Sequence, residues 1–154
     1  MNLSLRLLTA VFSFLVGVNA LADESRPSGP SKPTHSEYFV SVGAGVIQNR
    51  EDPTSTFVIA LAPNKPLPPN STLLIEFENP SNPESPFVVV DKLDEKGELH
   101  ARSPKVDRIY NKRAYLVRTK LIGEGQKILS IHDQWIWFEL PKELRNGYAT
   151  NIVD

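Results

Sequence analysis

The chain has 154 residues, 40% of them hydrophobic and 23% charged, and it contains no cysteine. Its 17 basic and 18 acidic residues nearly cancel, which excludes a global electrostatic signature of nucleic-acid binding. Without cysteine the chain has no disulfide, no thiolate metal ligand and no lipobox thiol for a lipid, so we expect one small domain held together by apolar packing.

The N-terminal 22 residues have the layout of a cleavable secretion signal. Arg6 provides a positive charge, and an apolar run of 12 residues follows it, whereas a membrane-spanning helix needs about 20. We expect cleavage after Ala22, with Ala20 as the alternative site, no transmembrane segment, and a periplasmic or secreted protein. An uncleaved N-terminal anchor is the competing interpretation. The lack of cysteine favours a bacterial envelope.

Residues 23–36 read DESRPSGPSKPTHS, with three prolines and no large apolar side chain. Such a segment cannot bury enough surface to offset the entropy of ordering it. We expect a flexible leader that acts as a spacer between the cleavage site and a single domain over residues 37–154. A recognition motif in the leader is the alternative.

From Glu37 onward, apolar side chains recur at every second residue, which is typical of half-buried strands. Gly43 and Gly45 mark a bend or bulge in the first strand. Residues 87–90 are apolar on both faces and are expected to form a central strand. The expected strands lie near residues 38–46, 57–61, 73–77, 87–90, 115–121 and 127–140, and the last segment is long enough for one bent strand or two.

Segments rich in proline and glycine separate the strands. The short segments DEKGE (94–98) and GEGQ (123–126) predict hairpin turns. PNKPLPPN (63–70) and NPSNPESP (79–86) predict longer loops that carry the chain from one sheet to the other. About seven antiparallel strands without helices predict an all-β, two-sheet sandwich.

The order of the elements and the stretch Tyr115-Leu116-Val117-Arg118, followed by the GEGQ turn, resemble an immunoglobulin-like or fibronectin-type-III-like sandwich over the final third of the chain. The chain lacks a buried cysteine pair, which excludes the antibody-type version. The resemblance implies a protein that binds or scaffolds more often than one that catalyses, and it leaves the ligand open.

No residue set has the specificity of a catalytic or metal signature. His35 lies in the leader, and His132 lies beside Asp133 on a strand, where neighbouring side chains point to opposite faces. We expect His132 to be a partly exposed polar residue, and a small hydrolase of envelope polymers with His132 as its base is an alternative. The acidic run at 91–98 lacks the ligand spacing of a calcium loop, so no metal or other cofactor is expected.

A basic segment extends from residue 102 to residue 120, with Asp107 as its single acid. Arg118 and Lys120 share one strand face and are expected to project outward. We predict a docking surface for an acidic protein, an anionic glycan or a lipid headgroup, against the plainer interpretation of a solvated face. The cations of this segment are Arg102, Lys105, Arg108, Lys112, Arg113, Arg118 and Lys120.

Trp135 and Trp137 share one face of the last strand, while Ile136 and Phe138 occupy the other. Packing of both indoles in the core is favoured, because burial is the common fate of tryptophan. The alternative is an exposed binding platform that stacks on sugar rings or grips a partner.

These features favour an exported, non-enzymatic binding or accessory module whose partner is a protein or an anionic glycan and not a nucleic acid. A structural subunit of a surface assembly, with the leader donated as a strand, is a further alternative. Asn70-Ser71-Thr72 is a formal glycosylation acceptor, which matters only in a eukaryotic secretory pathway. The sequence leaves the oligomeric state open.

Overall fold

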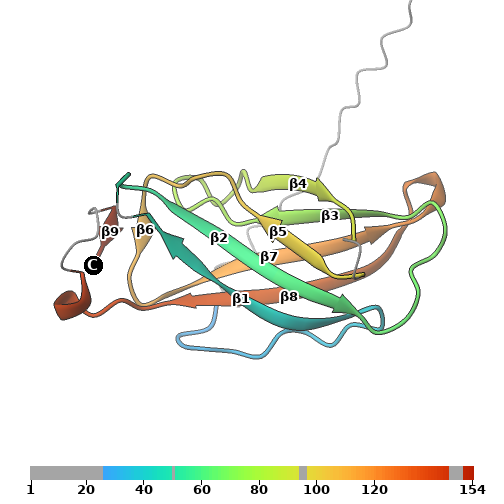
Figure 1. The fold of residues 1–154 in the computed structure, drawn as a ribbon, viewed down its shortest axis with the longest axis horizontal. Coiled ribbons are helices and arrows are strands. Elements are labelled where there is room, and N and C mark those ends of the chain that lie inside the picture. The colour runs from blue at the N-terminus through green and yellow to red at the C-terminus, as the bar shows by residue number, and fades with distance from the viewer. Residues whose placement is uncertain (1–25, 50, 94–96, 146–150) are drawn as a thin grey trace, which may run out of the picture.

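The computed structural model describes residues 26–49, 51–93, 97–145 and 151–154, so the predicted secretion signal lies outside the described residues. The described chain folds into two antiparallel sheets and one short parallel pair (Figure 1). The three-stranded sheet has the order β1-β2-β5 and the four-stranded sheet the order β4-β3-β7-β8, so the expected all-β sandwich is confirmed. No helix in the described ranges is long and apolar enough to cross a membrane.

The strands differ in length, from 2 to 11 residues. The three-stranded sheet contains β1 (Phe39–Gln48), β2 (Ser55–Pro63) and β5 (Leu99–Arg102). The four-stranded sheet contains β3 (Thr72–Phe77), β4 (Phe87–Asp91), β7 (Arg113–Ile122) and β8 (Ile128–Phe138). The parallel pair joins β6 (Ile109–Tyr110) to β9 (Ile152–Val153), and single 3₁₀ turns lie at Glu124–Gln126 and Lys142–Leu144.

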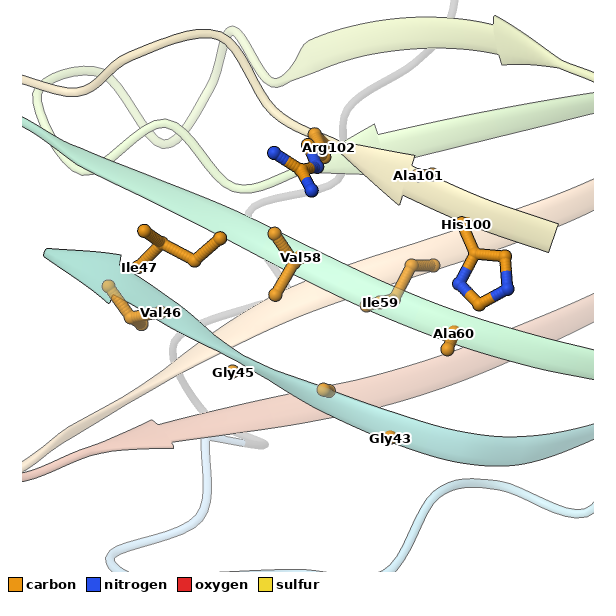
Figure 2. Close-up of a pocket in the computed structure, with 11 residues that line it drawn as sticks. Gly43, Gly45, Val46, Ile47, Val58, Ile59, Ala60, His100, Ala101 and Arg102 are labelled. Carbon is orange, nitrogen blue, oxygen red and sulfur yellow. The ribbon is translucent and has the colours of Figure 1, made fainter.

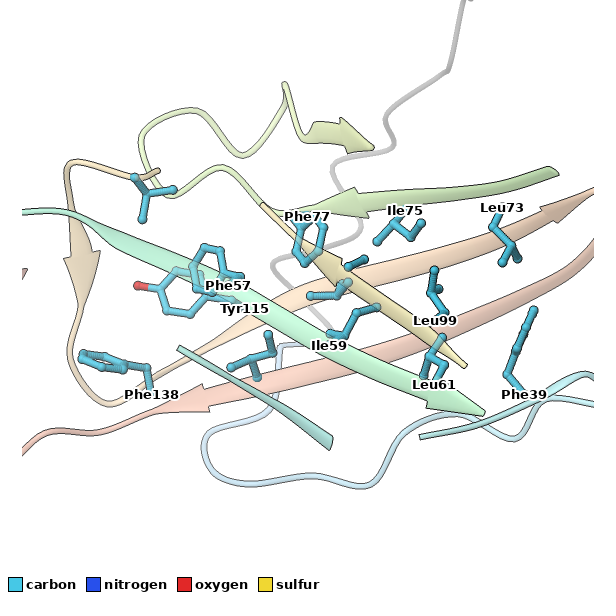
Figure 3. Packing of buried hydrophobic residues seen from close by; sticks show 14 of the residues in the cluster. Phe39, Phe57, Ile59, Leu61, Leu73, Ile75, Phe77, Leu99, Tyr115 and Phe138 are labelled. Carbon is cyan, nitrogen blue, oxygen red and sulfur yellow. The ribbon is translucent and has the colours of Figure 1, made fainter. Parts of the chain in front are cut away.

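The core lies between the two sheets, where the apolar half of each alternating strand is buried (Figure 3). Full burial of one such side chain contributes roughly 1.5–3 kcal/mol to folding. The rings of Phe57 and Tyr115 meet across the two sheets with centroids 4.9 Å apart. The main contributors are Phe57, Ile59 and Leu61 on β2, Leu73, Ile75 and Phe77 on β3, and Val117 and Leu121 on β7.

Tyr115 ties the start of β7 to the preceding strand. Its hydroxyl donates a hydrogen bond to the Tyr110 carbonyl oxygen (3.1 Å) and accepts one from the Tyr110 amide (2.5 Å). Burial raises the pKa of Tyr115 to about 12, so the hydroxyl stays protonated and available as a donor. Lys112 completes the turn between the two strands with a positive φ of 53°.

The loops between strands match the sequence predictions in part. Residues 64–71 carry the chain from β2 in one sheet to β3 in the other, and the GEGQ segment joins the neighbouring strands β7 and β8, both as expected. Two expectations are wrong. The proline-rich loop at 79–86 joins neighbours in the same sheet. The strands on either side of DEKGE, β4 and β5, lie in different sheets and do not pair as a hairpin, and residues 94–96 themselves lie outside the described residues.

Strand β4 lies at the edge of its sheet, which corrects the expectation of a central strand. Val88 and Val90 point away from the core and are 55% and 65% exposed. A run of valines has the same apolar pattern on both faces, so periodicity alone does not distinguish a central strand from an edge strand.

Residues 26–36, here called the strap, lie along the β8 side of the sandwich and lead into β1 (Figure 1). Ser36 is buried, and its hydroxyl accepts hydrogen bonds from the amides of Tyr38 and Phe39. Thr34 bonds to the backbone of Asp133 on β8. These contacts differ from the free spacer that the composition predicts, because the strap bonds through backbone and hydroxyl groups that an apolar-residue count does not register.

Candidate functional site

The predicted basic segment does not form one surface. On the outer face of the four-stranded sheet, Arg118 makes a two-pronged ion pair with Asp133, with Nε–Oδ1 at 2.7 Å and Nη2–Oδ2 at 2.8 Å. This hydrogen bonding raises the pKa of Arg118. Lys120 is only 9% exposed and donates from Nζ to Glu76 Oε1 at 2.5 Å. Both cations are therefore paired with carboxylates of the same sheet. Lys120 was expected to project into solvent, and this expectation is wrong.

Arg113 belongs to a buried ion cluster around Glu78. The Glu78 side chain is 4% exposed, and its Oε1 accepts from Arg113 Nη2 at 3.1 Å. Its Oε2 accepts from Arg26 Nη1 at 2.9 Å and from the Leu116 amide at 3.0 Å. A buried carboxylate with this many donors holds structure together, because removing it takes away the counter-charge that these cations share. We assign Arg113 to this structural cluster.

The other four cations are exposed and lie apart from these clusters. Lys105 pairs with Asp52 at 2.6 Å, and this hydrogen bond lowers the pKa of Asp52. Arg102, Arg108 and Lys112 form no ion pair with any residue that the structure describes. Arg102 lies on β5, whereas Arg108 precedes β6 and Lys112 lies in the turn after it.

Trp135 and Trp137 lie half-buried on the outer face of the four-stranded sheet. The intervening residues Ile136 and Phe138 point into the core, which confirms the alternation along β8. The Arg26 guanidinium lies 5.6 Å from the ring centroid of Trp135, and Trp137 Nε1 donates to Glu139 Oε2 at 3.3 Å. The favoured expectation of core packing is therefore wrong, and a platform role for these indoles stays a prediction.

His132 is 2% exposed, which corrects the expectation of a partly exposed residue. Burial lowers its pKa, so the ring is neutral near neutral pH. Neither ring nitrogen has a hydrogen-bond partner among the described residues. The hydroxyl of Ser130, two residues before His132 on the same strand, lies 3.3 Å from the hydroxyl of Ser36. The described ranges also contain no group of three residues suited to hold a metal ion.

A hollow of about 400 Å³ lies on the outer face of the three-stranded sheet (Figure 2). Gly43 and Gly45 contribute no side chain to this face, and they lie across from Ala60 and Val58 on β2. A Cβ added at either glycine would meet nothing within 4 Å, and neither has a positive φ. The fold therefore requires a glycine at neither position. Glycine inside a strand lowers the stability of the strand, and strand positions that keep a glycine often allow a ligand or another chain to approach closely.

One wall of this hollow is polar. Arg102 pairs in register with Val58, and His100 pairs in register with Ala60. His100 Nε2 lies 3.1 Å from Glu98 Oε2. The arrangement gives an apolar floor beside a cationic wall, which suits a partner that combines apolar surface with a negative charge.

The sequence prediction included Arg102 but missed the rest of the hollow. It read Gly43 and Gly45 as a bend, and β1 does have a register shift between Ser41 and Gly43. The signal that was available is the outward half of β2, where Val58 and Ala60 are apolar although that face is not in the core. An outward apolar row beside two glycines is the local signal that could have identified this hollow.

Comparison with known proteins adds no assignment. No known protein family matches the chain, and no curated protein is detectably similar to it in sequence.

Proposed function

We propose that the chain is an exported, non-catalytic binding module that holds a partner against the outer face of its three-stranded sheet. The observation that carries this proposal is the hollow at Gly43 and Gly45, with Arg102 on its wall and no requirement of the fold for either glycine. A partner with apolar side chains and at least one carboxylate complements this surface.

The contrast between the two outer faces supports the choice of surface. On the outer face of the four-stranded sheet the charges are paired, with Glu76 bonded to Lys120 and Asp133 bonded to Arg118. The exposed apolar residues of that face, Val88, Val90 and Ile131, lie on its two edge strands. On the outer side of β1, Val40, Val42 and Ile47 are 49%, 59% and 45% exposed. Together with the apolar floor of the hollow, these residues enlarge the exposed apolar surface of this sheet, and large exposed apolar patches often mark interaction sites.

The strand order supports the immunoglobulin-like resemblance. The first, second and fifth strands form one sheet, and the fourth, third, seventh and eighth form the other. The Tyr115 hydroxyl bonds back to the chain five residues upstream, as in the tyrosine corner of such sandwiches. Domains of this architecture serve binding more often than catalysis, which favours the module over a hydrolase based on the buried His132.

Export is the second half of the proposal. The apolar run at 7–18 and the site after Ala22 support a signal that is removed, and the lack of cysteine supports a periplasmic setting. The partner is then a protein or an anionic glycan of the envelope, since the near-zero net charge does not favour nucleic acid.

The test is affinity capture from the native envelope with three matched variants. Val58→Glu and Arg102→Glu place a negative charge in the hollow, and both are expected to lose the captured partner while keeping the fold. Val88→Glu is the control, since it places the same charge on an exposed valine of the other sheet. Retention of the same partner by all three variants would contradict the proposed surface.

A further inference from the structure

The strap closes the edge of the sandwich beside β8, the last strand of the four-stranded sheet. The Thr34 amide donates to the Asp133 carbonyl oxygen at 2.8 Å, and the Asp133 amide donates to Thr34 Oγ1 at 2.8 Å. Arg26 anchors the other end of the strap, because its Nη1 donates to Glu78 Oε2 and to the Ala114 carbonyl oxygen. The strap therefore occupies both backbone hydrogen-bonding groups of Asp133 on the edge strand β8.

His132 lies at this closed edge and is the least satisfied titratable group there. Its ring is buried, and neither Nδ1 nor Nε2 has a hydrogen-bond partner among the described residues. The main chain of Thr34 lies near enough to favour the protonated ring, without forming a hydrogen bond. The neighbouring Gln134 is 7% exposed, and its Oε1 also lacks a partner in the described part of the chain. Buried polar atoms of this kind are uncommon and require a physical reason.

Few charged groups surround this ring. Asp133 is the one charge whose field favours the imidazolium. Strands β1 and β2 contain no titratable residue, and opposite His132 on β7 lies Thr119, which is uncharged. Arg118 and Lys120 are on the other face of the sheet, paired with carboxylates. On the strap, Lys32 and His35 are exposed to solvent.

We propose that the strap is an acid-sensitive latch, in which protonation of His132 favours release of residues 26–36 from the β8 edge. A proton on the ring creates a charge in a buried site, where the cost of desolvation outweighs the favourable effects of the Thr34 main chain and the Asp133 charge. Opening the strap gives the ring access to water while the two sheets stay packed, and such local opening costs less than global unfolding.

The direction follows from linkage. The open ring has the ordinary histidine pKa of about 6.5, while the closed ring has a lower one, so the open state binds more protons between these two values. Within that window the open-to-closed ratio rises about tenfold for each pH unit of acidification. Release exposes the Asp133 backbone and removes Arg26 from Trp135, so acid uncovers a strand edge and an indole together.

Hydrogen exchange of the intact chain, read by mass spectrometry between pH 7.5 and pH 5, tests this directly. After correction for the intrinsic pH dependence of exchange, peptides covering 26–36 and the Asp133 amide are expected to lose protection as pH falls. Peptides from β3 and β7 serve as an internal reference and are expected to stay protected. Equal loss of protection in all peptides would mean global unfolding and would overturn the latch.

Variants identify the titrating group. His132→Phe is expected to make strap protection independent of pH. His132→Gln is expected to give the same result, and it replaces the first variant in the test if the larger apolar ring of phenylalanine disturbs folding. His35→Gln and His100→Gln are matched controls on exposed histidines and are expected to keep the wild-type response. A pH response that survives in both His132 variants would assign the effect to another group and overturn the proposal, as would strap protection that is constant from pH 7.5 to pH 5.

An optical readout makes the same test independently. In a Trp137→Phe background, Trp135 is the only tryptophan and reports on the strap through Arg26. Acrylamide quenching is expected to increase as pH falls in this protein and to stay constant when His132→Phe is added. Quenching that is unchanged by pH in the single-tryptophan protein would contradict release of the strap.

Discussion

Replacement of Glu78 by glutamine is the sharpest test of how the outer face of the four-stranded sheet is held. The Glu78 side chain is 4% exposed, and the side chains of Arg26 and Arg113 are 14% and 26% exposed. Glu78→Gln removes the carboxylate that both guanidinium groups share in this partly buried site. Breaking a buried pair from one side costs about 3–5 kcal/mol, and the remaining solvent contact of the arginines places the expected loss near 3 kcal/mol.

The assay is urea unfolding followed by tryptophan fluorescence, since Trp135 lies beside this cluster. A domain of this size has roughly 5–15 kcal/mol of stability, so the expected loss is large and is read as a lower midpoint with an unchanged slope. Glu84→Gln on an exposed loop is the matched control and is expected to stay within about 0.5 kcal/mol of the wild type. A loss below about 0.5 kcal/mol for Glu78→Gln would refute the reasoning, because it would mean that solvent already satisfies the arginines.

Three further predictions concern packing and pH. Phe77→Ala is expected to lower the free energy of unfolding by about 3–5 kcal/mol because the ring is fully buried, whereas Val89→Ala on the edge strand is expected to lower it by less than about 1.5 kcal/mol. Equal losses of stability for the two variants in urea unfolding would show that β4 is not an edge strand. Trp135→Ala and Trp137→Ala are each expected to cost about 1–2 kcal/mol, as half-buried residues, and losses above about 3 kcal/mol in the same assay would place the indoles in a core. Because the pKa of His132 is lowered in the folded state, global stability is expected to fall as pH drops below about 6.5, and His132→Phe is expected to reduce this slope in thermal unfolding at matched pH values.

Local pattern was enough to predict the fold class. The alternation of Phe57, Ile59 and Leu61 and the same alternation around Ile75 identify strands with one buried face, and both are found in the core. Edge position is a different kind of property, because it depends on which strands pair over long sequence distances. The valines of β4 therefore suggested a central strand, and β5 was missed because its four residues are too short for a periodic signal.

The candidate sites were harder to predict, because the partners of charged residues come from distant strands. Arg118 and Lys120 do lie on an outer face as the strand phase predicts, but Asp133 and Glu76 neutralise them there. The buried position of His132 depends on its edge of the sandwich and on the strap, and neither is visible in the residues beside it. The hollow depends on the register that sets two glycines of β1 opposite Val58 and Ala60.

Site-specific photocrosslinking in the native envelope tests the proposed binding surface most directly. A photoreactive phenylalanine derivative is placed either at Val58, inside the hollow, or at Val88, which is exposed on the other sheet. The binding module predicts a discrete crosslinked product from position 58 and none from position 88. The absence of any product from position 58, or the same product from both positions, would contradict binding at the three-stranded sheet.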